Sequence, residues 1–289
     1  MMEGIVTVLK PPGMSSSDVV VDVRRMFETK RVGHLGTLDP EAAGVLPVCV
    51  GRAVRLFDYL VDKQKTYLAE LVFGASTDTQ DAQGTVLETS DRIVSEAELD
   101  AVLSRFTGTI VQTPPMYSAL KHNGKKLYDL ARAGAEIPDK SRKIEIALLE
   151  RAETLGTNRF LIRVCCSRGT YIRTLCSDIG DALQVPAHMA FLLRTESGAF
   201  TLDHALPIAE LEAKKADGTL SDALVSCEDA VAFLPRLDLK EDRLRATKNG
   251  LSTRTKAADG TYRLYCGAFL GIGVVQNGSA ALKVHLYGE

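Results

Sequence analysis

The sequence predicts an α+β fold in which strands and helices make up a large N-terminal part and a small β-rich unit follows. Three observations support this prediction. Apolar runs of strand-like pattern lie between turns, serines that can cap helices precede segments of helical periodicity, and the runs after residue 235 are all strand-like. A chain of 289 residues is long for one domain and short for three, which favours one large domain with a small appendage.

The N-terminal segment is expected to contain a strand and two helices. Residues 4–9 alternate enough to form a strand, and the sequence Lys-Pro-Pro-Gly at 10–13 ends it. Residues 15–17 are serines, which favour the N-cap of a helix. The helix that they begin has its apolar residues at helical spacing: Val19, Val20, Val23 and Phe27. Residues 54–60 predict a second helix.

A strand pair and a helix are expected next. Residues 67–73 have the pattern of a strand and residues 84–88 that of its partner, with a turn-rich segment at 77–83 between them. Ser95 followed by Glu98 is a capping-box pattern, which predicts a helix up to residue 106.

The central part of the chain begins with a basic segment. Residues 121–142 are polar, basic and interrupted by glycine and proline, so they indicate an exposed insertion that contains a helix. Residues 144–152 and 159–167 predict a hairpin, and residues 169–183 predict the next helix.

The pattern changes toward the C-terminus. Residues 206–233 are helical and polar, whereas residues 236–289 contain short strand-like runs separated by glycine-rich turns. This change predicts a separate small β unit over 236–289, and a β-extension of the main domain is the alternative. The strand-like runs are residues 262–266, 269–275 and 281–285.

Composition excludes several protein classes. Hydrophobic residues make up 45% of the chain, yet no run approaches the roughly 18 apolar residues of a membrane span. The first residues lack a basic region followed by an apolar stretch, so we expect a soluble cytoplasmic protein without a leader. The six cysteines form no CxxC pair and have no histidine at ligand-like spacing, so we expect reduced structural thiols and no metal site.

Charge is distributed unevenly along the chain. The formal net charge is -2, which by itself argues against a nucleic-acid partner. Residues 120–175, however, contain twelve basic and six acidic residues, a local excess of +6, so the remainder sums to -8. This asymmetry fits an RNA-binding face, although a solvated surface is the commoner explanation of a charge cluster.

One acid lies in a loop of restricted conformation. Asp39 is followed by Pro40, which restricts it to extended conformations, and glycines at 33, 36 and 44 allow tight turns. The apolar run at 45–50 should anchor this loop in the core. An isolated aspartate in a turn usually only bonds its own backbone, so the loop alone does not establish a role for Asp39.

The residues around this acid closely resemble a known family. Residues 33–56 (GHLGTLDPEAAGVLPVCVGRAVRL) resemble the active-site loop of the TruB-type tRNA pseudouridine synthases, which isomerise uridine 55 in the T-loop of tRNA. Ser15 stands where the family commonly has threonine. Five further blocks fit in order, so the chain is identified as a member of this family: 10–16 (KPPGMSS), 65–67 (KTY), 77–84 (TDTQDAQG), 112–121 (QTPPMYSALK) and 166–175 (CSRGTYIRTL).

The resemblance implies a pseudouridine-synthase fold and roles for individual residues. The fold has a mixed, largely antiparallel sheet flanked by helices. In the family, Asp39 corresponds to the catalytic nucleophile, Arg173 to an arginine that holds it, and Tyr67 to a tyrosine that stacks on the target base. Leu192 matches an apolar residue packed against the flipped uracil. Leu193 departs from the family, where arginine is common, so one phosphate contact is expected to be missing.

The resemblance also implies how RNA is bound. His34 matches a histidine that fills the space left by the flipped base. Lys10 and Pro11 are expected to support the catalytic loop. Residues of an RNA-clamping insertion at about 120–143 should contact the substrate, in particular Lys121, Lys125 and Lys126. Residues 1–235 would then form the catalytic domain and residues 236–289 an RNA-binding β-barrel of the PUA type.

Two alternatives to a standalone tRNA enzyme are considered. A guide-RNA-dependent synthase that modifies ribosomal RNA shares the aspartate loop, but the short chain without a basic tail favours the standalone type. An RNA-folding chaperone with a dispensable site is the second, and the presence of Asp39, Tyr67 and Arg173 argues against it as the sole role. We therefore expect a cofactor-free monomer that acts on the tRNA T-arm without a membrane or a protein partner.

Overall fold

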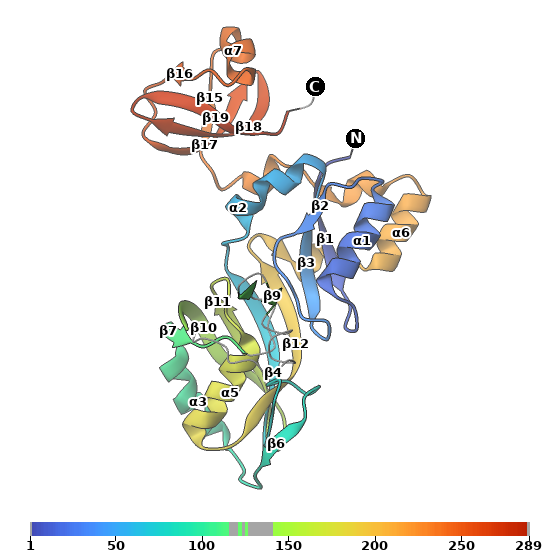
Figure 1. Cartoon of the computed structure of the whole chain (residues 1–289), viewed down its shortest axis with the longest axis vertical. Coiled ribbons are helices and arrows are strands. Elements are labelled where there is room, and N and C mark those ends of the chain that lie inside the picture. The colour runs from blue at the N-terminus through green and yellow to red at the C-terminus, as the bar shows by residue number, and fades with distance from the viewer. Residues whose placement is uncertain (1, 116–120, 123–124, 127–140, 288–289) are drawn as a thin grey trace.

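The computed structural model describes residues 2–115, 121–122, 125–126 and 141–287 (Figure 1). A ten-stranded mixed sheet is built from strands that lie between residues 4 and 225. Eight strands lie in the order β14-β1-β3-β12-β4-β11-β10-β7, while β2 pairs with β3 and β13 with β12. Strands β3 and β12 run parallel, and the other pairs of this described sheet run antiparallel. The strands are β1 (Gly4–Lys10), β2 (Val32–His34), β3 (Ala43–Val50), β4 (Lys65–Phe73), β7 (Gly108–Gln112), β10 (Arg142–Gly156), β11 (Arg159–Cys166), β12 (Ala187–Ser197), β13 (Phe200–Thr201) and β14 (Leu224–Val225).

The predicted N-terminal strand and first helix are confirmed. Helix α1 (Ser16–Met26) begins at Ser15, whose side chain accepts the backbone N–H of Asp18 while the Asp18 carboxylate accepts the N–H of Ser15. Its buried face includes Val19 and Val23. The predicted second helix is shorter than expected, because a 3₁₀ segment (Gly51–Leu56) precedes α2 (Phe57–Leu60). The longer helices pack on the sheet (Figure 1): α3 (Glu96–Leu103), α5 (Ile172–Leu183) and α6 (Ile208–Ala216).

One strand pairing predicted from the sequence is wrong. The strand at 84–88 was expected beside β4, but its counterpart β6 (Val86–Thr89) pairs with β5 (Ala75–Thr77). Strand β4 has no room for it, because β11 and β12 occupy both of its edges. The expected hairpin is confirmed as β10 and β11, and the helix after it as α5.

Strand β12 is the central element that the sequence patterns did not reveal. It runs parallel to β3 on one side and antiparallel to β4 on the other, so it joins the N-terminal strands to the rest of the sheet. Its register places Leu193 and Arg194 beside Ala43 and Gly44, and Arg194 also opposite Tyr67. The loop with Asp39 and the strand with Tyr67 are thereby held together.

The last part of the chain forms a second sheet with its own apolar core. Its five strands lie in the order β15-β17-β18-β19-β16, and Leu264, Leu270 and Leu282 are among its buried residues. Beta strands were expected for three of its segments, which are confirmed as β17, β18 and β19. The elements are β15 (Arg236–Asp238), α7 (Leu244–Lys248), β16 (Thr253–Arg254), β17 (Gly260–Cys266), β18 (Ala268–Gln276) and β19 (Ser279–His285).

The second sheet contacts the start of the first one. Ile272 and Leu286 share a buried apolar cluster with Ile5 and Leu56. Arg55 donates a hydrogen bond to the backbone carbonyl of His285 at 2.8 Å. The two sheets are therefore joined by an apolar contact as well as by the chain itself.

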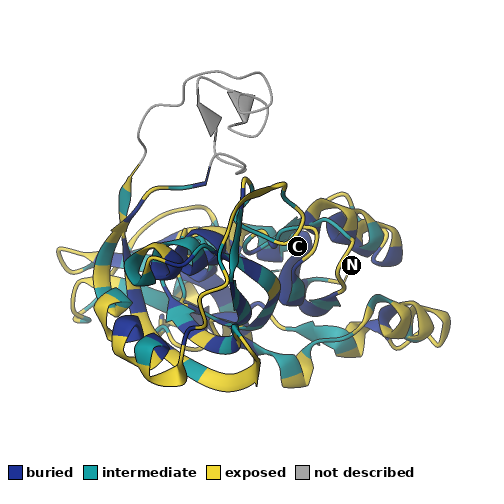
Figure 2. Cartoon of the chain, turned by 90° about the horizontal axis from the view of Figure 1, so that it is seen from below, coloured by how far each residue is buried: buried dark blue, intermediate teal, exposed yellow. Residues whose placement is uncertain are grey.

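The structure confirms the α+β class and the mixed, largely antiparallel sheet. Figure 2 shows buried residues along the sheet and on the inner faces of the helices, with exposed residues on the outer faces. None of the described helices is long and apolar enough to cross a membrane. Most of the expected insertion at 120–143 lies outside the described residues. Within it, Lys121–His122 pair with Lys125–Lys126 as two short antiparallel strands.

Candidate active site

The aspartate loop connects β2 to β3 and is fixed at several points. Leu35 donates its N–H to Pro47 O at 2.9 Å, and Ala42 donates its N–H to Asp39 O at 3.1 Å. Gly44 has a φ of +114° and faces β12 so closely that a Cβ would lie 2.2 Å from the carbonyl oxygen of Arg194. Only glycine fits this position without displacing the strand.

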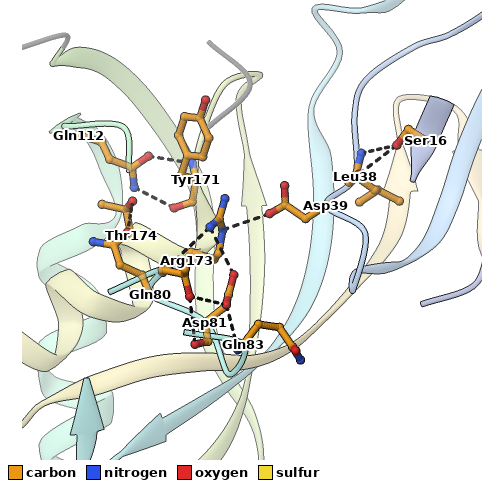
Figure 3. Close-up of polar contacts among 11 residues, drawn as sticks. Ser16, Leu38, Asp39, Gln80, Asp81, Gln83, Gln112, Tyr171, Arg173 and Thr174 are labelled. Atoms are coloured by element: carbon orange, nitrogen blue, oxygen red, sulfur yellow. Dashed lines mark hydrogen bonds and ion pairs between the residues drawn. The ribbon is translucent and has the colours of Figure 1, made fainter. Parts of the chain in front are cut away.

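Asp39 forms an ion pair with Arg173 (Figure 3). The Arg173 Nε and the Asp39 Oδ2 are 3.1 Å apart, and the Arg173 side chain is 8% exposed while that of Asp39 is 46% exposed. Arg173 comes from the first turn of α5, far from the loop in sequence. A carboxylate held by a buried guanidinium and still open to solvent can approach a ligand in its charged form.

A second carboxylate holds Arg173 from its other side. Arg173 Nη1 lies 3.3 Å from Asp81 Oδ2 and 3.0 Å from the carbonyl oxygen of Thr79. Asp81 is itself fixed, because its Oδ1 accepts the Thr79 hydroxyl at 2.7 Å and the N–H of Gln83 at 3.1 Å. The residues form a chain from Asp81 through Arg173 to Asp39. Asp81 lies in a block that resembles the family, but no role was predicted for it from the sequence.

The start of α5 is also fixed. The Gln112 side chain donates to Tyr171 O at 3.0 Å and accepts the N–H of Tyr171 at 2.8 Å. Thr174 donates its hydroxyl to Gln80 Oε1 at 2.8 Å. These contacts flank Arg173 and restrict the direction of its guanidinium (Figure 3).

Tyr67 and Leu192 lie on neighbouring strands next to this ion pair. Tyr67 on β4 is 8% exposed, and burial raises the pKa of its hydroxyl, so the phenol is neutral at neutral pH. Leu192 on β12 is 7% exposed. A small cavity of about 30 Å³ is lined by Leu192 together with Asp39 and Asp81. The structure thus brings Asp39, Arg173 and Leu192 to one place, with Tyr67 on the adjacent strand.

Two buried cations lie behind the aspartate loop and bind its backbone. Lys10 donates to the carbonyl oxygens of Pro11 at 2.8 Å, Pro40 at 2.8 Å and Ala42 at 2.6 Å. Burial lowers the pKa of this ammonium. Pro11 is an exposed residue whose carbonyl accepts from Lys10. These contacts tie the residues that follow Asp39 to the end of β1.

Arg194 is the second of these cations, and it was not predicted from the sequence. It is 1% exposed and donates to the carbonyl oxygens of Val45 at 2.7 Å, Gly36 at 3.1 Å and Thr37 at 3.4 Å. The signal was present, since an arginine inside the apolar sequence of β12 needs buried acceptors. Arg194 therefore links β12 to both arms of the aspartate loop.

His34 is the last residue of β2, directly before the aspartate loop, and does not line the Asp39 cavity. It is partly exposed, and its Nδ1 accepts the N–H of Gly36 at 3.3 Å. Burial lowers the pKa of its ring. The side chains of Lys121, Lys125 and Lys126 lie outside the described residues. Among the described residues, no group of three or more His, Cys, Asp or Glu side chains could hold a metal ion.

Two family models match consecutive parts of the chain. The TruB family pseudouridylate synthase (N terminal domain) model matches residues 24–172, and the tRNA pseudouridylate synthase B C-terminal domain model matches residues 173–232.

Curated relatives match over most of their own length. A tRNA pseudouridine synthase B of Geobacillus thermodenitrificans is 46% identical over 263 residues, which are 89% of this chain and 87% of the relative. The protein of the same name from Bacillus pumilus is 46% identical over 256 residues, 86% of this chain and 83% of the relative.

Solved structures share the architecture at lower identity. A chain of a Cbf5-Nop10-Gar1 complex has a TM-score of 0.71 and 27% identity, covering 94% of this chain and 78% of that chain. A chain of an H/ACA RNP bound to a substrate RNA containing 2′-deoxyuridine has a TM-score of 0.74 and 24% identity, covering 98% and 85%.

Proposed function

Because the chain belongs to the TruB family of pseudouridylate synthases, we propose that it converts uridine 55 in the T-loop of tRNA to pseudouridine. The observation that supports this most directly is the ion pair between Asp39 and Arg173, at 3.1 Å, in a loop tied down by two buried cations. It presents one charged carboxylate oxygen at a fixed place, as a nucleophile requires.

The isomerisation needs no external atom. The bond between N1 of uracil and C1′ of the sugar breaks, the ring turns, C5 bonds to C1′, and the C5 proton is removed while N1 gains one. Asp39 serves as the nucleophile and Arg173 orients its carboxylate through their ion pair. By analogy with the family, Tyr67 stacks on the base and assists removal of the C5 proton, and Leu192 packs against the uracil.

The direct test is tritium release from tRNA labelled at C5 of uridine, with mapping of the product position. We expect release without added metal or cofactor and pseudouridine at position 55. Release at a different position would refute the substrate assignment, and no release from intact tRNA would refute the activity itself.

Arg194 is proposed as a positioning residue for the aspartate loop. Arg194→Met should slow the single-turnover rate by about 100-fold at saturating tRNA, because a displacement of about 1 Å at a reacting group can cost that much. Binding should change much less than the rate. Arg163→Met, at an exposed arginine on β11, is the matched control. A parent-like rate in a folded Arg194→Met protein would contradict the positioning role.

His34 is proposed to occupy the space that the flipped uridine leaves. His34→Ala should weaken productive binding of intact tRNA by about tenfold or more, since base flipping costs a few kcal/mol. A stem-loop whose T-loop is already open should be affected less. Equal losses on both RNAs would argue against the stacking role.

Further proposals concern the organisation of RNA binding. Residues 1–235 form the catalytic domain, residues at about 120–143 an RNA-clamping insertion, and residues 236–289 a PUA-like RNA-binding domain. The basic excess of residues 120–175 and the separate core of the second sheet support this division. We propose that the protein acts in the cytoplasm as a monomer without a protein partner.

Removal of residues 236–289 tests the domain proposal. The remaining chain should fold and modify the same uridine more slowly, with a lower Tm, because Ile5 and Leu56 lose the cover of Ile272 and Leu286. Thermal unfolding and tritium release measure both effects. A fragment that is insoluble would show that the second sheet belongs to the main core.

A further inference from the structure

A groove of about 620 Å³ lies on the side of the aspartate loop where His34 is found. It is lined by α1, by residues 30–34 and by the start of α2. Asp39 does not line it, although Asp39 lies only five residues after His34 and lines the smaller cavity. We call this feature the α1 groove; its volume is in the range of about 300–1,000 Å³ typical of ligand sites.

The α1 groove is positively charged. Arg24, Lys30 and Arg31 line it, and its lining contains no carboxylate. None of these three cations forms an ion pair within the described part of the chain, whereas the neighbouring Arg25 pairs with Asp22 at 3.3 Å and with Glu212 at 2.8 Å. The carboxylates of Asp22 and Glu212 are therefore engaged by Arg25, which does not line the groove. Three cations without a carboxylate partner favour a bound anion, and a phosphodiester is the anion that RNA supplies.

The groove also has an exposed apolar wall. Phe57 is 43% exposed and Val21 is 58% exposed, and both line it. Arg24 is oriented by a hydrogen bond from its Nη2 to the carbonyl oxygen of Val32 at 3.2 Å. An aromatic face beside a group of cations matches the two parts of a nucleotide, because the base stacks on the ring while the phosphate contacts the cations.

We propose that the α1 groove binds one unpaired nucleotide adjacent to the reacting uridine, with its phosphate on Arg24, Lys30 and Arg31 and its base on Phe57. This inference rests on the proposed function. His34 connects the two sites, because it lines the groove and directly precedes the loop that presents Asp39. When the uridine turns toward Asp39, its neighbour loses a stacking partner and the groove offers it a new one.

The base contact is tested by a double-substitution cycle in the full-length protein. The RNA is a T-arm stem-loop with an abasic ribose placed on either side of the target uridine in turn. At one of these positions the abasic change should raise the Kd of the parent by about fivefold or more, and Phe57→Ala should raise the Kd for the unmodified RNA similarly. The two effects should not add, and Phe57→Tyr should restore binding. Additive effects at both positions would overturn the proposal.

The phosphate contact is tested with Arg24→Gln, Lys30→Gln and Arg31→Gln combined. This variant should raise the Kd by about tenfold or more and lower the salt slope by about 1 for each phosphate that the protein no longer neutralises. Arg25→Gln, whose parent side chain is paired elsewhere, is the matched control. Binding equal to that of the control, or an equal weakening on a fully paired hairpin, would overturn the proposal. If the parent protein bound RNA but formed no pseudouridine, the proposed function would be refuted, and the binding measurements would still test the nucleotide site in the α1 groove.

Discussion

Asp39→Asn is expected to lower the single-turnover rate of pseudouridine formation by about 10⁴-fold or more while tRNA binding stays near the parent value. Asparagine is nearly the same size and keeps the loop in place, but its amide cannot attack as a carboxylate oxygen does. The Asp39 side chain is 46% exposed and, among the described residues, pairs with Arg173, while the Asp39 backbone carbonyl accepts from Ala42 in the adjacent turn. The amide of asparagine leaves this turn unchanged, so folding should be retained. Tritium release and filter binding separate the two effects.

A matched control lies in the same loop. Glu41 is exposed and lies two residues after Asp39, so Glu41→Gln removes a neighbouring carboxylate from the same loop. We expect its rate to stay within about tenfold of the parent rate. Parent-like turnover by Asp39→Asn would refute the assignment of the nucleophile. Equal reductions in the two variants would show a general effect of loop charge in place of a specific nucleophile.

Arg173→Met is expected to have the second-largest effect, a reduction of about 10²- to 10³-fold in the single-turnover rate. The guanidinium contacts Asp39 at 3.1 Å, Asp81 at 3.3 Å and Thr79 O at 3.0 Å, so its removal frees the Asp39 carboxylate and takes one donor from Asp81 and from Thr79 O. Losing an oriented charged group at a reacting centre typically costs about 3–4 kcal/mol of barrier. Unfolding free energy should fall by about 1–3 kcal/mol, because a buried donor is removed.

Arg173→Lys separates charge from geometry. A single ammonium retains the positive charge but cannot contact two carboxylates and a carbonyl in the fixed directions of a guanidinium. We expect a rate between those of the parent and Arg173→Met, together with a Tm closer to the parent. If Arg173→Lys were as fast as the parent, the chain of contacts from Asp81 through Arg173 to Asp39 would not matter for orientation.

Local features of the sequence determined much of the fold. The Ser15 and Ser95 capping boxes, the strand before residue 10 and the β10–β11 hairpin depend on interactions within a few residues or across one turn, so they could be predicted. The family motifs likewise indicated Asp39, Arg173 and Tyr67 as the residues of the site. What each of them contacts was not contained in those motifs.

Tertiary structure alone decided how the site is held. The place of β12 depends on pairing with β3 and β4, more than a hundred residues away, and the same pairing puts Arg194 behind the aspartate loop and excludes β6 from the edge of β4. Asp81 likewise acquires its contact only when α5 packs near its turn. Hydrophobic pattern shows that a residue is buried but not what it faces. Whether a buried charged side chain such as Arg194 stabilises a loop depends on the acceptors around it, and only long-range packing brings those acceptors into contact.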